Sequence, residues 1–275
     1  MEQEGDQTKQ DSIQIQQLDA HSTSFDRHAS LARLVSTRST RRGLHTNIER
    51  MRYVNEHLYR WCKPDRPHKT LYVGVGHGLD ALLALQDGLT AQIIGVDPYF
   101  DAAGNDSKDL DHLMAVTNTL GLQNQFTVAQ MTIQDYLLRH DTQFDLIIIN
   151  EVLHHIYKTD DLLRQSRHMG QPVDLFRRLR ATSNCAGSLV IGDAERHGLR
   201  QMFTNVGLLK SSIRYGTKQP REEWSSAAIE GGWELANQMN YIPWAFRNQA
   251  WMWSGRLGRH TLCDKYILHF TPGDA

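Results

Sequence analysis

The chain has 275 residues, of which 40% are hydrophobic and 22% charged, so it can build an ordinary globular interior. Its formal net charge of −1 excludes a strong overall attraction to nucleic acid or to an anionic membrane. The three cysteines, Cys62, Cys185 and Cys263, have no metal-ligand spacing and indicate no disulfide framework. Without a signal-peptide pattern or an apolar run of about 18 residues, we expect a soluble, cytoplasmic protein with no membrane contact.

The N-terminal part of the chain divides into two segments of different composition. Residues 1–24 are rich in Gln, Asp, Ser and Thr and contain few large apolar side chains, which predicts a flexible tail. Residues 25–66 are expected to form an N-terminal helical cap, because apolar residues recur every three or four positions over residues 44–61. Residues 67–275 would then form one larger domain.

The strongest motif is the run Leu71–Gly78, which reads Leu-Tyr-Val-Gly-Val-Gly-His-Gly. An apolar strand pattern breaks into three glycines at alternate positions, and an apolar helix pattern follows at once. Gly74, Gly76 and Gly78 would let the backbone approach a ligand without interference from Cβ atoms. A helix N-terminus that follows such a turn directs its free N–H groups at the ligand, so the motif predicts a binding cradle.

A second anchor lies in Ile93–Asp97, an apolar strand pattern that ends in a carboxylate and is followed by Pro98. Asp97 stands about 20 residues past the glycine loop, where a nucleotide-binding βαβ unit holds a ribose hydroxyl. A dinucleotide fingerprint would also need Gly or Ala at the position of Leu79, so that fingerprint fails. The sequence therefore predicts a nucleotide-like cofactor of another class.

Strand and helix patterns alternate through the middle of the chain, which predicts a parallel sheet with helices on both faces. Strands are expected over residues 71–75, 92–96, 125–129, 144–149 and 188–192, and helices over 79–87, 108–120, 132–139 and a long region reaching residue 182. In such a sheet, ligands bind beyond the carboxyl ends of the strands. Polar side chains stand at four of these ends: Asp97, Gln130, Asn150 and Asp193.

The C-terminal part is expected to begin with a helix over residues 222–236, although a strand pattern starts within 233–239. A final strand is predicted over Lys265–Phe270. The segment between them is rich in aromatic residues, and Trp244–Trp253 could pack against an apolar acceptor or a cation near a substrate opening.

With these motifs in this order, the chain resembles the class I S-adenosylmethionine-dependent methyltransferases, whose first motif has the form G-x-G-x-G. The resemblance runs from about Lys69 to Phe270, and it includes Phe144–Ile156 as the fourth strand and the turn after it, and 187–193 as the fifth strand. It implies an α/β fold with a Rossmann-like, seven-stranded, mostly parallel sheet, an antiparallel last strand and added N-terminal helices. Residues 67–275 would be the methyltransferase domain.

The resemblance also implies S-adenosylmethionine as cofactor. Gln130 could accept a hydrogen bond from the adenine amine, and Met131 would pack on the adenine ring. The expected cofactor-binding residues are Gly74, Gly76, Gly78, Asp97, Pro98, Gln130, Met131 and Asn150.

The sequence departs from the family at Tyr72, where many members carry an acid that helps to orient the cofactor's amino group. Another group must do so here, or the amino-acid end is held differently.

For the chemistry, His154 and His155 are the candidate catalytic residues, because the imidazole pKa lies near neutrality and the family places its acceptor near this turn. No compact carboxylate–His set suggests a metal. The prediction is methyl transfer to a small-molecule acceptor at oxygen. The sequence does not distinguish oxygen, nitrogen and carbon acceptors. It also leaves open whether the protein forms a homodimer.

Two alternatives remain. Residues 27–66 contain ten Lys or Arg and three Asp or Glu, and residues 196–221 contain six basic residues and no acid. These segments are compatible with an RNA- or protein-directed methyltransferase, although no RNA-binding module or aromatic stacking motif accompanies them. A nucleic-acid partner is therefore the less favoured alternative, and it stays open. The departure at Tyr72 is compatible with a catalytically silent methyltransferase-like module.

Overall fold

The computed structural model describes residues 44–62, 68–99, 107–157, 170–194, 218–241, 244, 247 and 265–273. Several predictions lie outside these residues: the tail over 1–24, the part of the N-terminal cap before residue 44, most of the basic segment 196–221 and most of the aromatic segment 244–253.

The described residues form one seven-stranded sheet with the strand order β3-β2-β1-β4-β5-β7-β6. The first five strands pair in parallel, whereas β7 runs antiparallel to both β5 and β6. The strands are β1 (Lys69–Val73), β2 (Gln92–Val96), β3 (Phe126–Ala129), β4 (Phe144–Asn150), β5 (Ser183–Ala194), β6 (Trp233–Tyr241) and β7 (Lys265–Pro272). The predicted fold class, with its antiparallel last strand, is confirmed.

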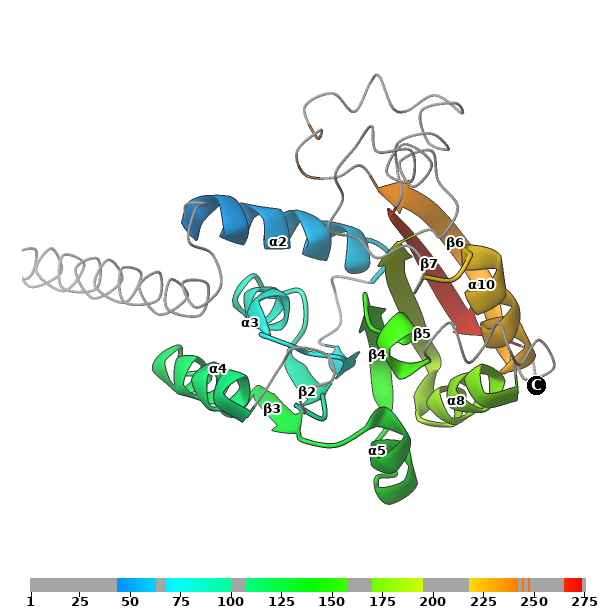
Figure 1. Ribbon diagram of the computed structural model, residues 1–275, viewed down its shortest axis with the longest axis horizontal. Helices are drawn as coiled ribbons and strands as arrows, with labels where there is room; N and C mark the ends of the chain where they lie inside the picture. Colours follow the sequence, from blue (N-terminus) through cyan, green and yellow to red (C-terminus); the bar gives the residue numbers. More distant parts are fainter. Residues whose placement is uncertain are drawn as a thin grey trace, which may run out of the picture.

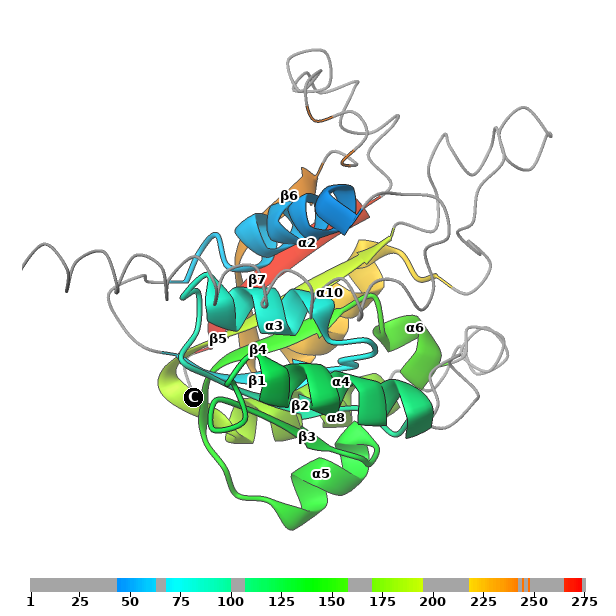
Figure 2. The same cartoon turned by 90° about the vertical axis from the view of Figure 1, so that its left-hand side faces the viewer.

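Helices cover both faces of this sheet (Figures 1 and 2). They are α2 (Leu44–Leu58), α3 (Leu79–Gln86), α4 (Ser107–Thr119), α5 (Ile133–Arg139), α6 (Leu153–Ile156), α8 (Gly170–Ala181) and α10 (Arg221–Glu230). Residues of α2, α3 and α4 pack into one apolar cluster, and residues of α5, α8 and α10 pack into a second cluster on the other face. None of the helices that the structure describes is long and apolar enough to cross a membrane.

The apolar pattern of β4 shows how the sequence specifies a doubly covered sheet. Leu146 and Ile148 belong to the cluster under α2, α3 and α4, whereas Ile147 and Ile149 belong to the opposite cluster. Because successive side chains of a strand point to opposite faces, a strand that is covered on both sides must be apolar throughout. All four side chains are at most 1% exposed, as this arrangement requires.

The predicted helix over residues 222–236 is wrong at its C-terminal end. The helix α10 stops at Glu230, and the pair Gly231-Gly232 turns the chain with a φ of +91° at Gly232. A positive φ is easily reached by glycine and ends a right-handed helix. Residues 233–241 then form β6, as the alternative strand pattern indicated. The strand predicted over 188–192 is also longer than expected, because β5 begins at Ser183.

The helix α2 is the described part of the predicted N-terminal cap, and it packs against α3 and the end of β5. The Arg52 guanidinium donates to the carboxylate of Asp87, just after α3, through two bonds of 2.8 and 2.9 Å. Leu58 and Ile48 on the inner side of α2 are buried. This helix therefore closes the sheet face next to the carboxyl end of β1, although the domain boundaries at residues 24 and 66 remain predictions.

Candidate functional site

The glycine loop leaves β1 through three residues with left-handed backbone. Gly74, Gly76 and Gly78 have φ angles of +75°, +54° and +68°. The Gly74 N–H donates to the carbonyl of Val96 over 2.8 Å, and the Gly78 N–H donates to the carbonyl of Val75 over 2.9 Å. L-residues with side chains rarely adopt such φ values, so the alternate glycines seen in the sequence are a requirement of this turn.

Packing restricts two of these glycines further. A Cβ atom at Gly74 would lie 2.5 Å from Cγ2 of Val152, in the turn after β4. A Cβ atom at Gly78 would lie 2.5 Å from Cδ1 of Leu113 in α4. The loop is thus held between two neighbouring segments, the turn after β4 and the helix α4.

Asp97 ties the end of β2 to the glycine loop. This carboxylate is 6% exposed, and it accepts hydrogen bonds from the Gly76 N–H at 2.9 Å and from the Tyr99 N–H at 3.0 Å. The Tyr99 hydroxyl in turn donates to the carbonyl of Gly76 over 2.6 Å. The loop and the predicted ribose-binding carboxylate therefore form one hydrogen-bonded unit, and Pro98 lies partly buried within it.

The departure at Tyr72 has a structural counterpart in the first turn of α3. Tyr72 is 1% exposed, and its hydroxyl donates to a carboxylate oxygen of Asp80. Burial raises the pKa of Asp80, an effect that the hydrogen bonds from Tyr72 and Asn150 partly offset. An acid is therefore present beside the loop, although it comes from position 80 instead of position 72.

The remaining predicted cofactor residues lie at the carboxyl ends of β3 and β4. Gln130 is exposed, and Met131 is partly buried against the apolar cluster under α5. The Asn150 side chain occupies the space that the missing side chain of Gly192 leaves open, since a Cβ there would lie 2.7 Å from Asn150 Oδ1. The structure thus joins Asp97 directly to the loop and places Asn150 beside Tyr72 and Asp80, while the adenine contacts of Gln130 and Met131 stay predictions.

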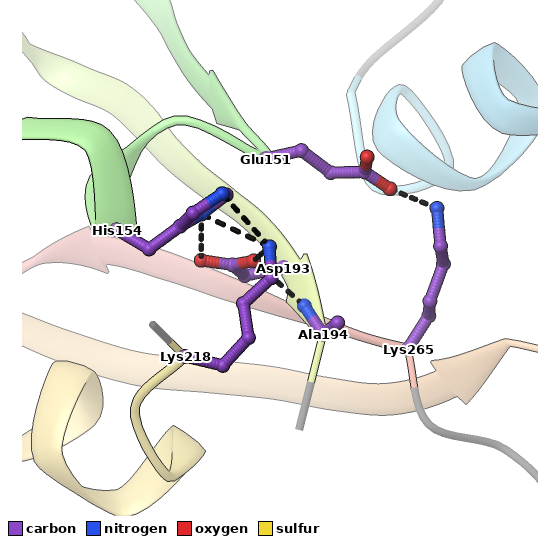
Figure 3. Close-up of polar contacts among 6 residues, drawn as sticks. All are labelled: Glu151, His154, Asp193, Ala194, Lys218 and Lys265. Carbon is purple, nitrogen blue, oxygen red and sulfur yellow. Dashed lines mark hydrogen bonds and ion pairs between the residues drawn. The ribbon is translucent and has the colours of Figure 1, made fainter. Parts of the chain in front are cut away.

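A second polar cluster lies at the carboxyl ends of β4 and β5 and joins Asp193, Lys218 and His154 (Figure 3). The Lys218 ammonium donates to Asp193 Oδ1 over 2.7 Å, and His154 Nδ1 lies 3.4 Å from Asp193 Oδ2. Lys218 Nζ is also 3.0 and 3.1 Å from the two ring nitrogens of His154. The side chains of Asp193 and Lys218 are 1% and 7% exposed, so these charges interact with little screening by water.

Electrostatics in this cluster favour an ionised carboxylate. Burial by itself raises the pKa of Asp193, but the hydrogen bond with His154 and the charge of Lys218 outweigh it, so this pKa lies below its usual value. The neighbouring His155 is exposed, and its ring centroid lies 4.1 Å from that of His154. Partial burial of the imidazole lowers the pKa of His155, and electrostatic repulsion from the nearby His154 and Lys218 lowers it further. Of the two predicted catalytic histidines, only His154 is thus bonded into the cluster.

An ion pair between Glu151 and Lys265 flanks the same edge of the sheet (Figure 3). Glu151 directly follows β4 with a φ of +54°, and Lys265 begins β7. Burial and the charge of Arg50 lower the pKa of Lys265 to about 8. This ion pair connects the turn after β4 to the start of β7. It is the second pair of opposite charges, after Asp193 and Lys218, near the carboxyl ends of the parallel strands.

The described part of the chain contains no group of three or more His, Cys, Asp or Glu side chains arranged to hold a metal ion. In the cluster around Asp193, the position next to the carboxylate is taken by the Lys218 ammonium. The negative charge of that carboxylate is therefore balanced by a side chain of the protein itself.

Sequence reasoning missed Asp80, Lys218 and Lys265. Lys218 contacts His154 across 64 positions, and Lys265 contacts Glu151 across 114 positions. Such contacts depend on the strand order and leave no spacing signal in the chain. Asp80 gave a weak signal, because it is an acid in the first turn of a helix that opens directly after the glycines.

Comparison with known proteins identifies the domain type. Residues 71–173, from β1 to the start of α8, match a family model described as a methyltransferase domain. No curated protein matches the chain significantly. The matched residues include the glycine loop, Asp97 and the turn with His154, and they end before Asp193 and Lys218.

Solved structures of methyltransferases share the fold. A protein assigned as a sarcosine dimethylglycine methyltransferase from Galdieria sulphuraria has a TM-score of 0.50 and 14% identity, with 82% of this chain and 86% of that chain covered. The cyclopropane synthase MmaA2 from Mycobacterium tuberculosis has a TM-score of 0.53 and 12% identity, covering 80% and 83%. Mitomycin 7-O-methyltransferase MmcR has a TM-score of 0.51 and 13% identity, covering 82% of this chain and 54% of MmcR.

At these identities the structural likeness concerns the fold. Together with the family match, it confirms the predicted resemblance to the class I S-adenosylmethionine-dependent methyltransferases and the prediction of a methyltransferase enzyme.

The packing around the glycine loop yields a stability prediction. We expect Gly74→Ala to lower the free energy of unfolding by about 1–3 kcal/mol more than Gly88→Ala, because the new methyl group would meet the β-branched Val152. Both glycines have a φ near +70°, so the backbone strain is matched, whereas a Cβ at Gly88 would meet nothing within 4 Å. Urea unfolding of both variants measures the difference, and equal losses would show that Val152 yields to the methyl group.

Proposed function

We propose that this methyltransferase domain binds S-adenosylmethionine in the crevice at the carboxyl ends of β1 and β4, and that it methylates a small-molecule acceptor at oxygen. The cofactor supplies a methyl group already activated on a sulfonium. The protein must therefore position the acceptor, exclude water and remove a proton where the acceptor requires it.

The observation that carries the proposal is the unit formed by Asp97 and the glycine loop. A carboxylate offers about four acceptor positions, and the amides of Gly76 and Tyr99 use two of those of Asp97. The remaining acceptor positions match the two hydroxyls of a ribose. The crevice lies at the topological switch point, because β2 and β4 flank β1 on opposite sides.

The glycine backbone supports the same ligand. The absence of a Cβ at Gly74 and Gly78 lets Val152 and Leu113 pack directly against the loop backbone. Tyr99 holds the loop in place through its bond to the Gly76 carbonyl. A preformed loop of this kind reduces the ordering that binding would otherwise require.

His154 is the group best placed to take a proton from an acceptor hydroxyl. The buried ion pair of Asp193 and Lys218 contacts its imidazole at the end of β5 and holds the ring in one orientation. An imidazole held in one orientation can act as a general base when the acceptor oxygen lies within hydrogen-bond reach. The name of one structural relative, mitomycin 7-O-methyltransferase, indicates that this fold is compatible with transfer to oxygen.

The alternative of a polyanionic substrate is less well supported by the described residues. Lys218 and Arg52 belong to the two basic segments noted in the sequence, yet Lys218 pairs with Asp193 and Arg52 pairs with Asp87. Basic side chains that already have carboxylate partners contribute little to a phosphate-binding surface. This favours an acceptor of small-molecule size over RNA.

The first prediction of this proposal concerns the cofactor. We expect Asp97→Asn to weaken the binding of S-adenosylhomocysteine by at least about tenfold, because bonds to a charged acceptor contribute roughly 1.5–3 kcal/mol each. Isothermal titration calorimetry measures the affinity, and Asp111→Asn is the control with the same charge change on the exposed surface of α4. Unchanged affinity in a folded Asp97→Asn protein would remove Asp97 from the site.

The second prediction concerns the base. After screening hydroxyl-bearing small molecules for an acceptor, we expect His154→Gln to lower kcat by about 10²–10⁴-fold without changing the affinity for S-adenosylhomocysteine. His155→Gln is the matched control, since its ring is exposed and lies outside the hydrogen bonds to Asp193. A larger loss of kcat in His155→Gln than in His154→Gln would contradict this assignment.

A further inference from the structure

The ion pair of Glu151 and Lys265 lies on a different face of the sheet from the cluster around Asp193. Alternate residues of a strand point to the same face. Lys265 therefore shares a face with Ile267, which belongs to the apolar cluster under α2, α3 and α4. Asp193 shares a face with Ile191, which belongs to the opposite cluster. Figure 3 accordingly shows the ion pair apart from Asp193, so the pair lies on the side of the sheet that α2 covers.

A second cation, from α2, lies close to this ion pair. Burial lowers the pKa of Lys265, and the positive charge of Arg50 is near enough to lower it further, to about 8. Both side chains are partly buried, so their charges are screened less than they would be in bulk water. Two cations at one place repel each other, and an anion that contacts both of them would offset this repulsion.

The charges at this place do not balance. The ion pair is neutral as a whole, whereas Arg50 forms no ion pair in the part of the chain that the structure describes. Its neighbour in the chain, Glu49, acts on Arg52 instead, because it adds to the rise in the Arg52 pKa that Asp87 causes. One positive charge is thus left over, and a ligand with one negative charge would balance it.

A ligand from solvent can reach these groups. The side chains of Lys265 and Glu151 are 19% and 43% exposed, in contrast to the nearly inaccessible pair of Asp193 and Lys218. The Lys265 ammonium already binds a carboxylate, that of Glu151. Because ion pairs that solvent reaches contribute little to stability, a ligand carboxylate can replace that of Glu151.

Aromatic rings lie on the same face of α2 as Arg50. Arg50, Tyr53 and His57 are three and four positions apart, a spacing that places them along one side of the helix. The Tyr53 ring contacts that of His57 at 4.4 Å and that of Trp244 at 5.5 Å, and the Arg247 guanidinium lies 3.3 Å from the centre of the Trp244 ring. Trp244 follows β6, whose last residue pairs with the first residue of β7. This place therefore combines positive charge with flat apolar surfaces.

We propose that Arg50 and Lys265 bind the carboxylate of an aromatic small-molecule acceptor, and that Tyr53 and Trp244 pack against its ring. This inference deepens the proposed function and rests on it, since it assigns the acceptor to the hydroxylated aromatic acids. A guanidinium binds a carboxylate through two parallel hydrogen bonds, which would orient such an acceptor. Glu151 stands three residues before His154, so the carboxylate site borders the proposed base.

The first test uses two probes of the same shape, benzoate and the neutral benzamide, with the full chain saturated with S-adenosylhomocysteine. An NMR titration measures both affinities. We expect benzoate to bind at least about fivefold more tightly than benzamide, and Arg50→Gln to reduce this preference to less than about twofold. Arg52→Gln is the matched control, because it removes the same charge from α2 at a residue that pairs with Asp87, and it should leave the preference unchanged.

Two further variants keep the proposal testable if Arg50→Gln fails to fold. Lys265→Gln should also remove most of the preference for benzoate. Glu151→Gln removes the carboxylate that competes for Lys265, so it should tighten benzoate by about two- to fivefold and leave benzamide unchanged. A merely structural role of the ion pair would instead change both affinities together.

The second test measures methyl transfer through the release of S-adenosylhomocysteine from S-adenosylmethionine. Hydroxybenzoic acids are compared with hydroxybenzamides of the same ring substitution. We expect the acids to have the lower KM, and Arg50→Gln to raise the KM of the best acid by at least about tenfold with little change in kcat.

Three outcomes would overturn the inference. The first is equal affinity for benzoate and benzamide, or no binding of either, in the unaltered protein. The second is a preference for benzoate that survives both Arg50→Gln and Lys265→Gln. The third is a lower KM for the amides than for the acids. A failure of the proposed function is seen separately: a protein that does not bind S-adenosylhomocysteine refutes it, and with it the assignment of the carboxylate to an acceptor, even where benzoate binds.

Discussion

The hydrogen bond between the Gly76 N–H and the Asp97 carboxylate joins the two parts of the molecule on which the site depends. It fixes a loop of left-handed glycines against the end of β2, and the parallel pairing of β1 with β2 brings these segments into register. Because β4 pairs with the opposite side of β1, the turn after β4 reaches the same loop through Val152. The glycine loop, the Asp97 carboxylate and the turn after β4 therefore meet at the carboxyl ends of β1, β2 and β4.

The charged groups at the carboxyl edge divide into two functions in this account. Asp97 lies against the glycine loop and keeps acceptor positions for the proposed cofactor. Asp193, Lys218 and His154 lie at the carboxyl end of β5, where the proposal places the acceptor. Separate carboxylates serve the two ligands, so each site can be altered by substitution without removing the other.

The sequence was sufficient for those features that depend on neighbours in the chain. The central strand β4 is an apolar run because both faces of the sheet are covered there, and the glycine positions follow from a turn that requires positive φ. The end of α10 was predicted wrongly because its apolar pattern continues into β6, and only the backbone turn at Gly231-Gly232 separates them. The bonds of Lys218 and Lys265 depend on the strand order and could not be read from spacing. Tyr72 was recognised as a departure, but its partner Asp80 emerged only from the structure.

The most direct test of the central claim is a crystal structure of the full chain with S-adenosylhomocysteine. The account predicts density across the ends of β1 and β4, with both ribose hydroxyls on Asp97. Density for the nucleoside at another place on the sheet, or a ribose that does not contact Asp97, would contradict it.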